Sequence, residues 1–176
     1  MRIGVDTTPL TGGRSGVGHF LYYQVKHMLR LEPALGWRYF ASGRHAPVLD
    51  GLAGFDRGRY VPLPTRVMYG LWTALRNPPV DSLLGGLDVF HAANYFLPPV
   101  RSARRVLTIY DLAFLRAPEW CSPKIVGPFS RHVPRFARKA DAILTCSEAS
   151  KRDIVALLQV PPERITVARG AVDEMF

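Results

Sequence analysis

Three short runs of apolar, largely β-branched residues in the second half of the chain constrain its fold most strongly. They lie within LDVFHAANY, RRVLTIYDL and ADAILTCSE, and each run stops at polar residues. Runs of this length are typical of strands that are buried on both faces, as in a parallel sheet. We therefore expect three parallel strands here, with polar side chains gathered at their carboxyl ends.

Strand and helix patterns also alternate through the rest of the chain. The spacing of apolar residues predicts strands over 2–5, 37–41, 59–63 and 165–168, and helices from 17 to Pro33 and over 67–75. A further helix is predicted over 123–139, although Pro128 and Pro134 should kink or split it. This order predicts an α/β fold, a doubly wound, Rossmann-like parallel sheet, formed by residues 1–176 as a single domain.

Composition narrows the function classes without choosing one. Among 176 residues, 23 basic against 14 acidic side chains give a net charge of +9, and most of the basic residues are Arg, so we expect an anionic partner. The sequence shows neither an apolar run of membrane-spanning length nor a signal peptide, which predicts a cytoplasmic protein. Cys121 and Cys146 have no metal-ligand spacing and are assigned no chemistry.

The glycine-rich stretch TGGRSGVGHF follows the first predicted strand and matches neither common phosphate-binding motif. Gly13 and Gly18 have P-loop spacing, but His19 and Phe20 stand where that motif needs Lys and Ser or Thr. The dinucleotide fingerprint fails as well, because Leu21 occupies the position of its third glycine.

Two interpretations of this glycine loop remain open. It is either a tight turn between strand and helix, or an anion site in which backbone N–H groups of Gly16, Val17 and Gly18 approach a phosphate. In the second case, the missing Lys requires another group to neutralise the phosphate.

Polar residues at the carboxyl ends of the other predicted strands are the remaining site candidates, because open parallel sheets bind ligands there. His91 is either a core histidine or part of a polar site, and Asp111 is either a helix cap or a hydroxyl-binding, base-like group. Ser147 is expected first of all to cap a helix that runs to Leu158. The full candidate set is His91, Asn94, Tyr95, Tyr110, Asp111, Ser147 and Glu148.

A basic cluster lies in the predicted helix over 123–139, which would gather its members on one side. It is either a solvated face or a surface that docks on an anionic membrane or acceptor. Nucleic acid is disfavoured, because Phe129 and Phe136 have the spacing of core residues. The members of the cluster are Arg131, Arg135, Arg138 and Lys139.

The ordered set GGRSGVGHF, DVFHAANYFLPP, VLTIYDLAFLRAPEW, ADAILTCSEASKRDIVALLQVPPERITV and GAVDEMF resembles the N-terminal domain of group 1 (family 4) retaining glycosyltransferases. Within this family it is most similar to the branch of bacterial mannosyltransferases. The resemblance covers nearly the whole chain and is weakest over 44–77. It implies the N-terminal half of a GT-B architecture, in which two Rossmann-like domains face across a cleft.

The resemblance also implies roles for the candidate residues. The loop at Gly16 would bind the diphosphate of a nucleotide-sugar donor without a metal ion or other cofactor. Asp111 and Tyr110 would lie at the reacting sugar, and the remaining candidates would bind the acceptor, a glycan or a lipid-linked sugar. Tyr110 departs from the family pattern, because many relatives have His there, and Tyr would keep a hydrogen-bond donor that does not titrate near neutral pH.

GAVDEMF corresponds to the linker that precedes the family's second, nucleotide-sugar domain. We therefore expect the 176-residue chain alone to be inactive and the full-length protein to be the enzyme. Two other classes stay open: a non-catalytic nucleotide- or glycan-binding module, and an oxidoreductase. The latter lacks the expected acidic residue after the second strand, where the chain has YFASGRHAP.

Overall fold

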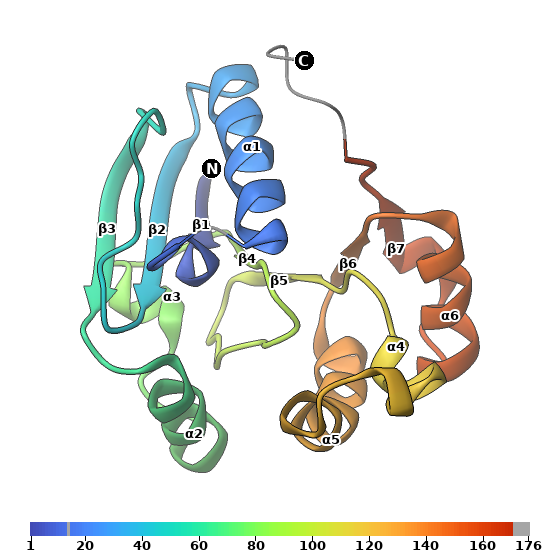
Figure 1. The fold of residues 1–176 in the computed structure, drawn as a ribbon. Coiled ribbons are helices and arrows are strands. Elements are labelled where there is room, and N and C mark those ends of the chain that lie inside the picture. The colour runs from blue at the N-terminus through green and yellow to red at the C-terminus, as the bar shows by residue number, and fades with distance from the viewer. Residues whose placement is uncertain (14, 171–176) are drawn as a thin grey trace. The chain divides into compact units, whose positions relative to one another are not determined.

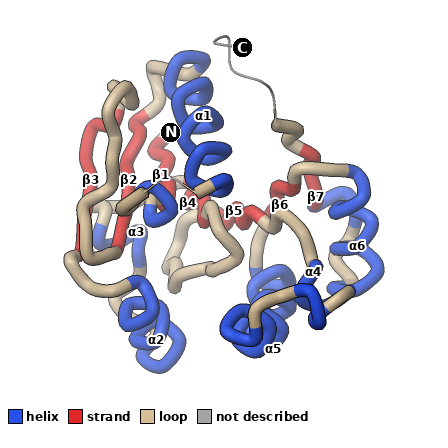
Figure 2. The backbone as a smooth tube through the Cα atoms, viewed as in Figure 1, coloured by secondary structure: helices blue, strands red, loops and turns tan. Residues whose placement is uncertain are grey.

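The computed structural model describes residues 1–13 and 15–170, and the chain divides into two compact units. The first unit consists of residues 1–93 and 98–104, and the second of residues 94–97 together with the chain from 105 onward. Each unit carries parallel strands and helices (Figures 1 and 2).

The sheet of the first unit has the strand order β3-β2-β1-β4. Its strands are β1 (Arg2–Asp6), β2 (Gly36–Ser42), β3 (Phe55–Val61) and β4 (Val89–Ala92). β1 pairs in parallel with both β2 and β4, so Val5 lies opposite Tyr39 on one side and His91 on the other. The chain moves outward from β1 to β3 and returns to β4, which places the topological switch point between β1 and β4.

Helices cover both faces of this sheet. They are α1 (Gly16–Leu31), α2 (Thr65–Leu75) and the short α3 (Val80–Leu83). The core that includes α1 contains Trp37 of β2, whereas Trp72 of α2 packs against Phe40 of β2, with ring centroids 5.1 Å apart. Since residues three apart in a strand point to opposite faces, α1 and α2 lie on opposite sides of β2.

The edge strand β3 depends on a glycine. Gly58 lies opposite Tyr39 in the β2–β3 pair, and a Cβ atom at position 58 would lie 1.9 Å from a carbon of the Tyr39 ring. The strand prediction over 59–63 was wrong at both ends, because β3 begins at Phe55 and stops at Val61. Pro62, which has no N–H to donate to a neighbouring strand, follows directly.

The second unit has the strand order β5-β6-β7, again parallel. Its strands are β5 (Arg104–Thr108), β6 (Ala142–Thr145) and β7 (Ile165–Val167), and its helices are α4 (Ala113–Arg116), α5 (Pro123–Lys139) and α6 (Glu148–Leu158). Of the two effects predicted for Pro128 and Pro134, a kink or a split, the split does not occur. α5 continues through Pro128 and Pro134, and it is held on the unit by buried Val133 and Ala137.

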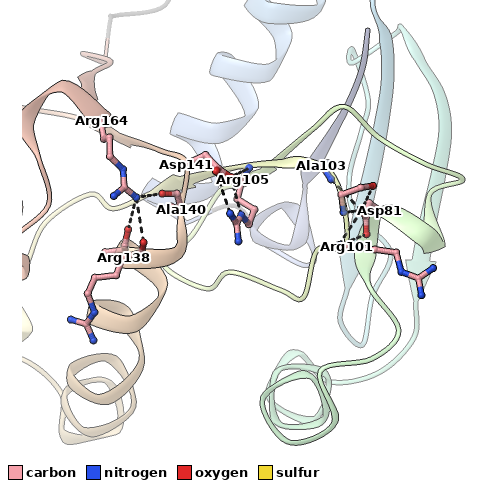
Figure 3. Close-up of polar contacts among 10 residues, drawn as sticks. Asp81, Arg101, Ala103, Arg105, Arg138, Ala140, Asp141 and Arg164 are labelled. Atoms are coloured by element: carbon pink, nitrogen blue, oxygen red, sulfur yellow. Dashed lines mark hydrogen bonds and ion pairs between the residues drawn. The ribbon is translucent and has the colours of Figure 1, made fainter.

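Charged side chains fasten the ends of these elements (Figure 3). In the second unit, Arg105 and Asp141 form a two-pronged ion pair of 2.8 and 3.2 Å at the starts of β5 and β6. Arg164 donates to the carbonyls of Arg138 and Ala140 at the C-terminal end of α5, where a cation is favoured by the helix dipole.

In the first unit, the carboxylate of Asp81 fixes the turn that precedes β5. It accepts the N–H groups of Arg101 at 3.0 Å, Ser102 at 2.8 Å and Ala103 at 3.3 Å (Figure 3). Burial raises the pKa of this carboxyl, but the hydrogen bonds outweigh burial and the pKa is lowered from 3.8. The predicted fold class, a doubly wound, Rossmann-like α/β architecture, is confirmed.

We expect Asp81→Asn to lower the free energy of unfolding by about 2 kcal/mol at pH 7, because one acceptor of several N–H groups is replaced by a donor. Since the folded-state pKa is lowered, the contribution of the carboxylate is complete above pH 3.8 and is lost as the pH falls through the folded-state pKa. Urea denaturation at pH 7 and pH 3 measures both values. The exposed carboxylate Asp56, changed to Asn, is the matched control. An equal effect of the two changes would contradict the prediction.

Candidate functional site

The N-terminus of α1 forms the first part of the candidate site. Gly16, Val17 and Gly18 belong to the first turn of α1, and the hydroxyl of the capping residue Ser15 accepts the N–H of Gly18 at 3.4 Å. The N–H groups of Gly16 and Val17 have no acceptor inside the helix, and the helix dipole adds positive potential there. A Cβ atom at Gly16 would meet nothing within 4 Å, so packing within the chain does not require glycine at this position.

A buried polar cluster lies at the carboxyl ends of β1 and β2, just before this helix in the chain. Asp6 is 3% exposed and accepts the N–H of Thr8 at 2.9 Å. The hydroxyl of Thr8 accepts the N–H of Ser42 at 3.1 Å. Among the described residues, the buried hydroxyl oxygen of Ser42 has no hydrogen-bond partner. The cluster therefore joins a carboxyl group to two hydroxyl groups at the strand ends.

Burial raises the pKa of Asp6 from 3.8 to about 6, against hydrogen bonds from Thr8 that lower it. Burial and the nearby Asp6 also raise the pKa of Tyr69. Asp6 was not among the site residues predicted from the sequence, although it ends an apolar strand just as Asp111 ends another.

His91 lies in β4, beside the switch point, and is 3% exposed. Burial lowers its pKa from 6.5 to about 4, so the imidazole is neutral at pH 7. A neutral, buried ring favours the core-histidine interpretation. At this position His91 can act through hydrogen bonds but not as a cation.

In the second unit, Tyr95 organises the end of β5. Its hydroxyl accepts the N–H of Asp111 at 3.0 Å, and its ring lies among Tyr110, Phe114 and Phe129 with centroids 5.0–6.1 Å away. Its backbone has φ of 53°, a left-handed conformation that is costly for a residue with a large side chain. The structure thus places Tyr95 as a buried support for the Tyr110–Asp111 turn.

The carboxylate of Asp111 is exposed and accepts the N–H of Ala113, the first residue of α4, at 3.0 Å, while the N-cap residue of α4 is Leu112. One oxygen is engaged in this way, and the side chain faces solvent. The carbonyl of Tyr110 accepts the Sγ–H of Cys146 at 3.2 Å, so the ends of β5 and β6 lie next to each other.

Ser147 caps α6, as predicted, because its hydroxyl accepts the N–H of Ser150 at 3.0 Å. Glu148 is the first residue of α6 and is exposed, while Asn94 is half-buried in the turn after β4. The second unit therefore brings Tyr95, Tyr110, Asp111 and Ser147 to the carboxyl ends of β5 and β6.

The basic cluster is partly as predicted. Arg131, Arg135 and Arg138 are exposed at helical spacing on α5, and Lys139 is half-buried. Exposed Lys124 lies seven residues before Arg131 and extends the same face. In the described part of the chain, no helix is both long and apolar enough to cross a membrane.

The fold defines a Rossmann-like α/β protein, and comparisons with known proteins specify its family. The sequence profile of Glycosyltransferase Family 4 matches residues 15–175, so the chain belongs to that family. The family resemblance seen in the sequence is confirmed. Of the closing motif GAVDEMF, residues 171–176 lie outside the described part of the structure.

One curated relative is the O-antigen chain mannosyltransferase B of Escherichia coli, which is 29% identical over 83 residues, 47% of this chain and 22% of the relative. One solved structure with a similar fold is UGT89C1 of Arabidopsis thaliana, crystallised with UDP-L-rhamnose. The TM-score is 0.55 at 13% identity, over 98% of this chain and 49% of that one. The chain therefore spans at most about half the length of these two proteins.

We compare the free energy of unfolding of Asp6→Asn with that of the wild-type protein. Between pH 4 and pH 7 this difference should shift in favour of the variant by up to about 3 kcal/mol, since one pKa unit corresponds to about 1.4 kcal/mol. Because the folded-state pKa is raised from 3.8 to about 6, the wild-type protein loses stability as the pH rises through this window, and Asn does not titrate. Denaturant unfolding at pH 4, 5, 6 and 7 measures the difference.

For the companion variant His91→Gln, the difference in free energy of unfolding from wild type should shift in favour of the variant as the pH falls. The folded-state pKa of His91 is lowered from 6.5 to about 4, so the wild-type protein loses stability as the pH falls through that window. If the free energy of unfolding changed with pH in the same way for wild type and both variants, the pKa shifts of Asp6 and His91 would be contradicted.

Proposed function

We propose that the chain is the acceptor-side domain of a retaining glycosyltransferase, a cytoplasmic enzyme of polysaccharide biosynthesis. The complete enzyme would move a hexose or deoxyhexose, mannose-like, from a nucleotide-diphosphate sugar to a glycan or lipid-linked acceptor. The observation that carries the proposal is the open N-terminus of α1, beside the switch point, in a member of a glycosyltransferase family. The mannosyltransferase relative supports the sugar class.

In this mechanism the donor diphosphate binds at the first turn of α1. As the bond between the sugar and the diphosphate breaks, negative charge develops on the leaving oxygen, and the N–H groups of Gly16 and Val17 stabilise it. The open space at Gly16 lets a phosphate approach the backbone closely. The glycine loop has no Lys of the P-loop kind, so a second domain would supply the cationic groups. The proposed reaction would need no metal ion.

The acceptor side is assigned to the strand-end groups. Asp111 exposes a carboxylate that can accept a hydrogen bond from a sugar hydroxyl, and Tyr110 would contribute its phenol. Tyr95 would hold this turn in place, while Asn94, Ser147 and Glu148 would line the same region. His91 would act as a neutral hydrogen-bonding group.

The decisive experiment is a transfer assay with a panel of radiolabelled nucleotide sugars, on the full product of the native gene and on the 176-residue chain. We expect Gly16→Val in the full product to lower kcat/KM about 100-fold, because its side chain would occupy the space of the phosphate. Thermal stability should change little, since nothing within the chain lies near that position.

Gly127→Val in α5 is the matched control, because a Cβ atom there also meets nothing within 4 Å. We expect the 176-residue chain alone to transfer no sugar. Sugar transfer by this chain alone would overturn the half-enzyme proposal. Tight donor binding by the full product without transfer to any acceptor would instead indicate a binding module.

We also propose peripheral contact with an anionic membrane through Arg131, Arg135, Arg138 and Lys139. No acidic residue lies between Glu119 and Asp141, so nothing on α5 opposes an anionic surface. Changing the three exposed arginines to Ser should weaken binding to phosphatidylglycerol vesicles about 100-fold at low salt, since each contributes about 1 kcal/mol at such a surface. Co-sedimentation measures the binding.

The control for this prediction removes the same charge elsewhere. Arg44, Arg57 and Arg59 are exposed on the first unit, and changing all three to Ser gives the same net charge. Equal losses of binding for both triple variants would show that only net charge matters and would contradict a specific α5 contact.

A further inference from the structure

The helix α2 has an outward face that the folding of the first unit does not explain. Its inward face is buried through Met68 and Trp72, which are 6% and 3% exposed. Its outward side carries large aliphatic residues that repeat every fourth position and remain 38–66% exposed, namely Leu63, Val67, Leu71 and Leu75. Leu63 precedes the helix, and the other three lie within it. We call these four residues the α2 stripe.

The outward face of α2 offers almost no polar group to a partner. Gly70 and Ala74 lie between the members of the stripe. The hydroxyl of Thr73, at its flank, already donates to the carbonyl of Tyr69 at 2.7 Å. A helix that is apolar on both sides is normally covered on both sides. The stripe is therefore a surface that fits an apolar environment and not water.

The charged residues on α2, and those next to it in the chain, have one sign. Between residues 57 and 80 the sequence contains four arginines and no acidic residue. Of these, Arg66 lies on α2 and Arg76 caps its C-terminal end. An apolar helix whose own charged residues are all cations is complementary to a bilayer with anionic headgroups, where leucines enter the acyl boundary and guanidinium groups remain among phosphates.

A second copy of the chain fits this face less well. Two stripes packed together would bring the bordering arginines of both copies toward one interface without an acidic partner, and like charges repel most strongly where water is excluded. A typical protein interface also has about one hydrogen bond per 100–200 Å², and the outward face of α2 offers hardly any.

We propose that the α2 stripe is a membrane-docking surface that inserts into the interface of an anionic lipid bilayer. α2 has 11 residues, about 16 Å of helix, so it lies in the plane of the membrane and does not cross it. The docking differs in kind from the contact proposed for α5, because it buries apolar side chains and is not purely electrostatic. It does not rest on sugar transfer, since lipid binding needs neither donor nor acceptor.

The test is binding of the 176-residue chain to vesicles of phosphatidylcholine with phosphatidylglycerol. We expect the double variant Leu71→Glu, Leu75→Glu to bind at least about 30-fold more weakly than wild type. The matched control is Leu31→Glu, Leu157→Glu, which changes two leucines that are 78% and 45% exposed on α1 and α6. The control pair should bind within about twofold of wild type. Equal losses in both pairs, or no vesicle binding by wild type, would overturn the proposal.

Salt and fluorescence separate insertion from simple attraction. At about 1 M salt the screening length is about 3 Å, so the α5 contribution is suppressed, and the ratio between wild type and the α2 variant should persist. A ratio that disappears at high salt would overturn insertion. Leu71→Trp should show a blue-shifted emission on vesicles, and Leu31→Trp should not. Equal emission shifts of the two variants would also overturn insertion.

Two further measurements assign the stripe to another occupant if the proposal is wrong. A concentration-dependent dimer in sedimentation velocity, abolished by Leu71→Glu, Leu75→Glu, would make the stripe an interface between copies. Loss of stripe-dependent vesicle binding in the full product of the gene would show that other parts of the polypeptide cover it. If stripe-dependent binding is kept in a full product that transfers no sugar, the docking stands while the proposed enzymatic function fails.

Discussion

The pairing of β1 with strands on both sides is the constraint on which the first unit depends. β1 is a central strand, with β2 on one side and β4 on the other, and all three run in the same direction. Parallel pairing forces their carboxyl ends to one edge, so Asp6 and Ser42 meet there through Thr8. The same geometry delivers the chain after β1 to the N-terminus of α1. Packing that buries Val5 and Leu21 therefore also fixes the location of the polar groups.

The chemistry at this edge follows from burial as much as from residue type. Asp6 and His91 would normally be charged and mostly neutral, respectively, at pH 7. Desolvation disfavours the charged form of both groups. It raises the pKa of Asp6 to about 6 and lowers the pKa of His91 to about 4. The backbone N–H groups at the start of α1 add partial positive charge at this edge. In the proposed function, oriented dipoles would hold the phosphate here and a separate domain would supply the cations.

Much of this could be predicted from the sequence, for physical reasons that also explain the failures. Buried parallel strands have apolar runs that end abruptly, so β4, β5 and β6 were located closely. The Ser147 cap was predictable because a hydroxyl before a helical pattern has one favourable use. β3 was misplaced because it is an edge strand with a largely exposed pattern, and its pairing with β2 includes the close contact between Gly58 and Tyr39. The short helices α3 and α4 carry too few residues to show periodicity.

The candidate site was predicted less well than the fold, because function at strand ends depends on burial that a sequence does not reveal. Asp6 and Asp111 both end apolar strands, yet Asp6 is 3% exposed with a raised pKa, while Asp111 faces solvent. Tyr95 looked like a ligand-binding side chain, and the structure places its ring in an aromatic cluster. In both cases the deciding factor was a tertiary contact between segments that are distant in the sequence.

The outer faces of α2 and α5 carry information of a different kind. Folding requires an apolar inward face on each helix, and both helices have one. It places no requirement on the outward face beyond solubility, which polar residues of either sign satisfy. The exposed charged residues of α5 are instead all cations, and α2 presents aliphatic side chains with Arg as its only charged residue type. Because folding of the two units requires neither pattern, we attribute each to the contacts proposed above.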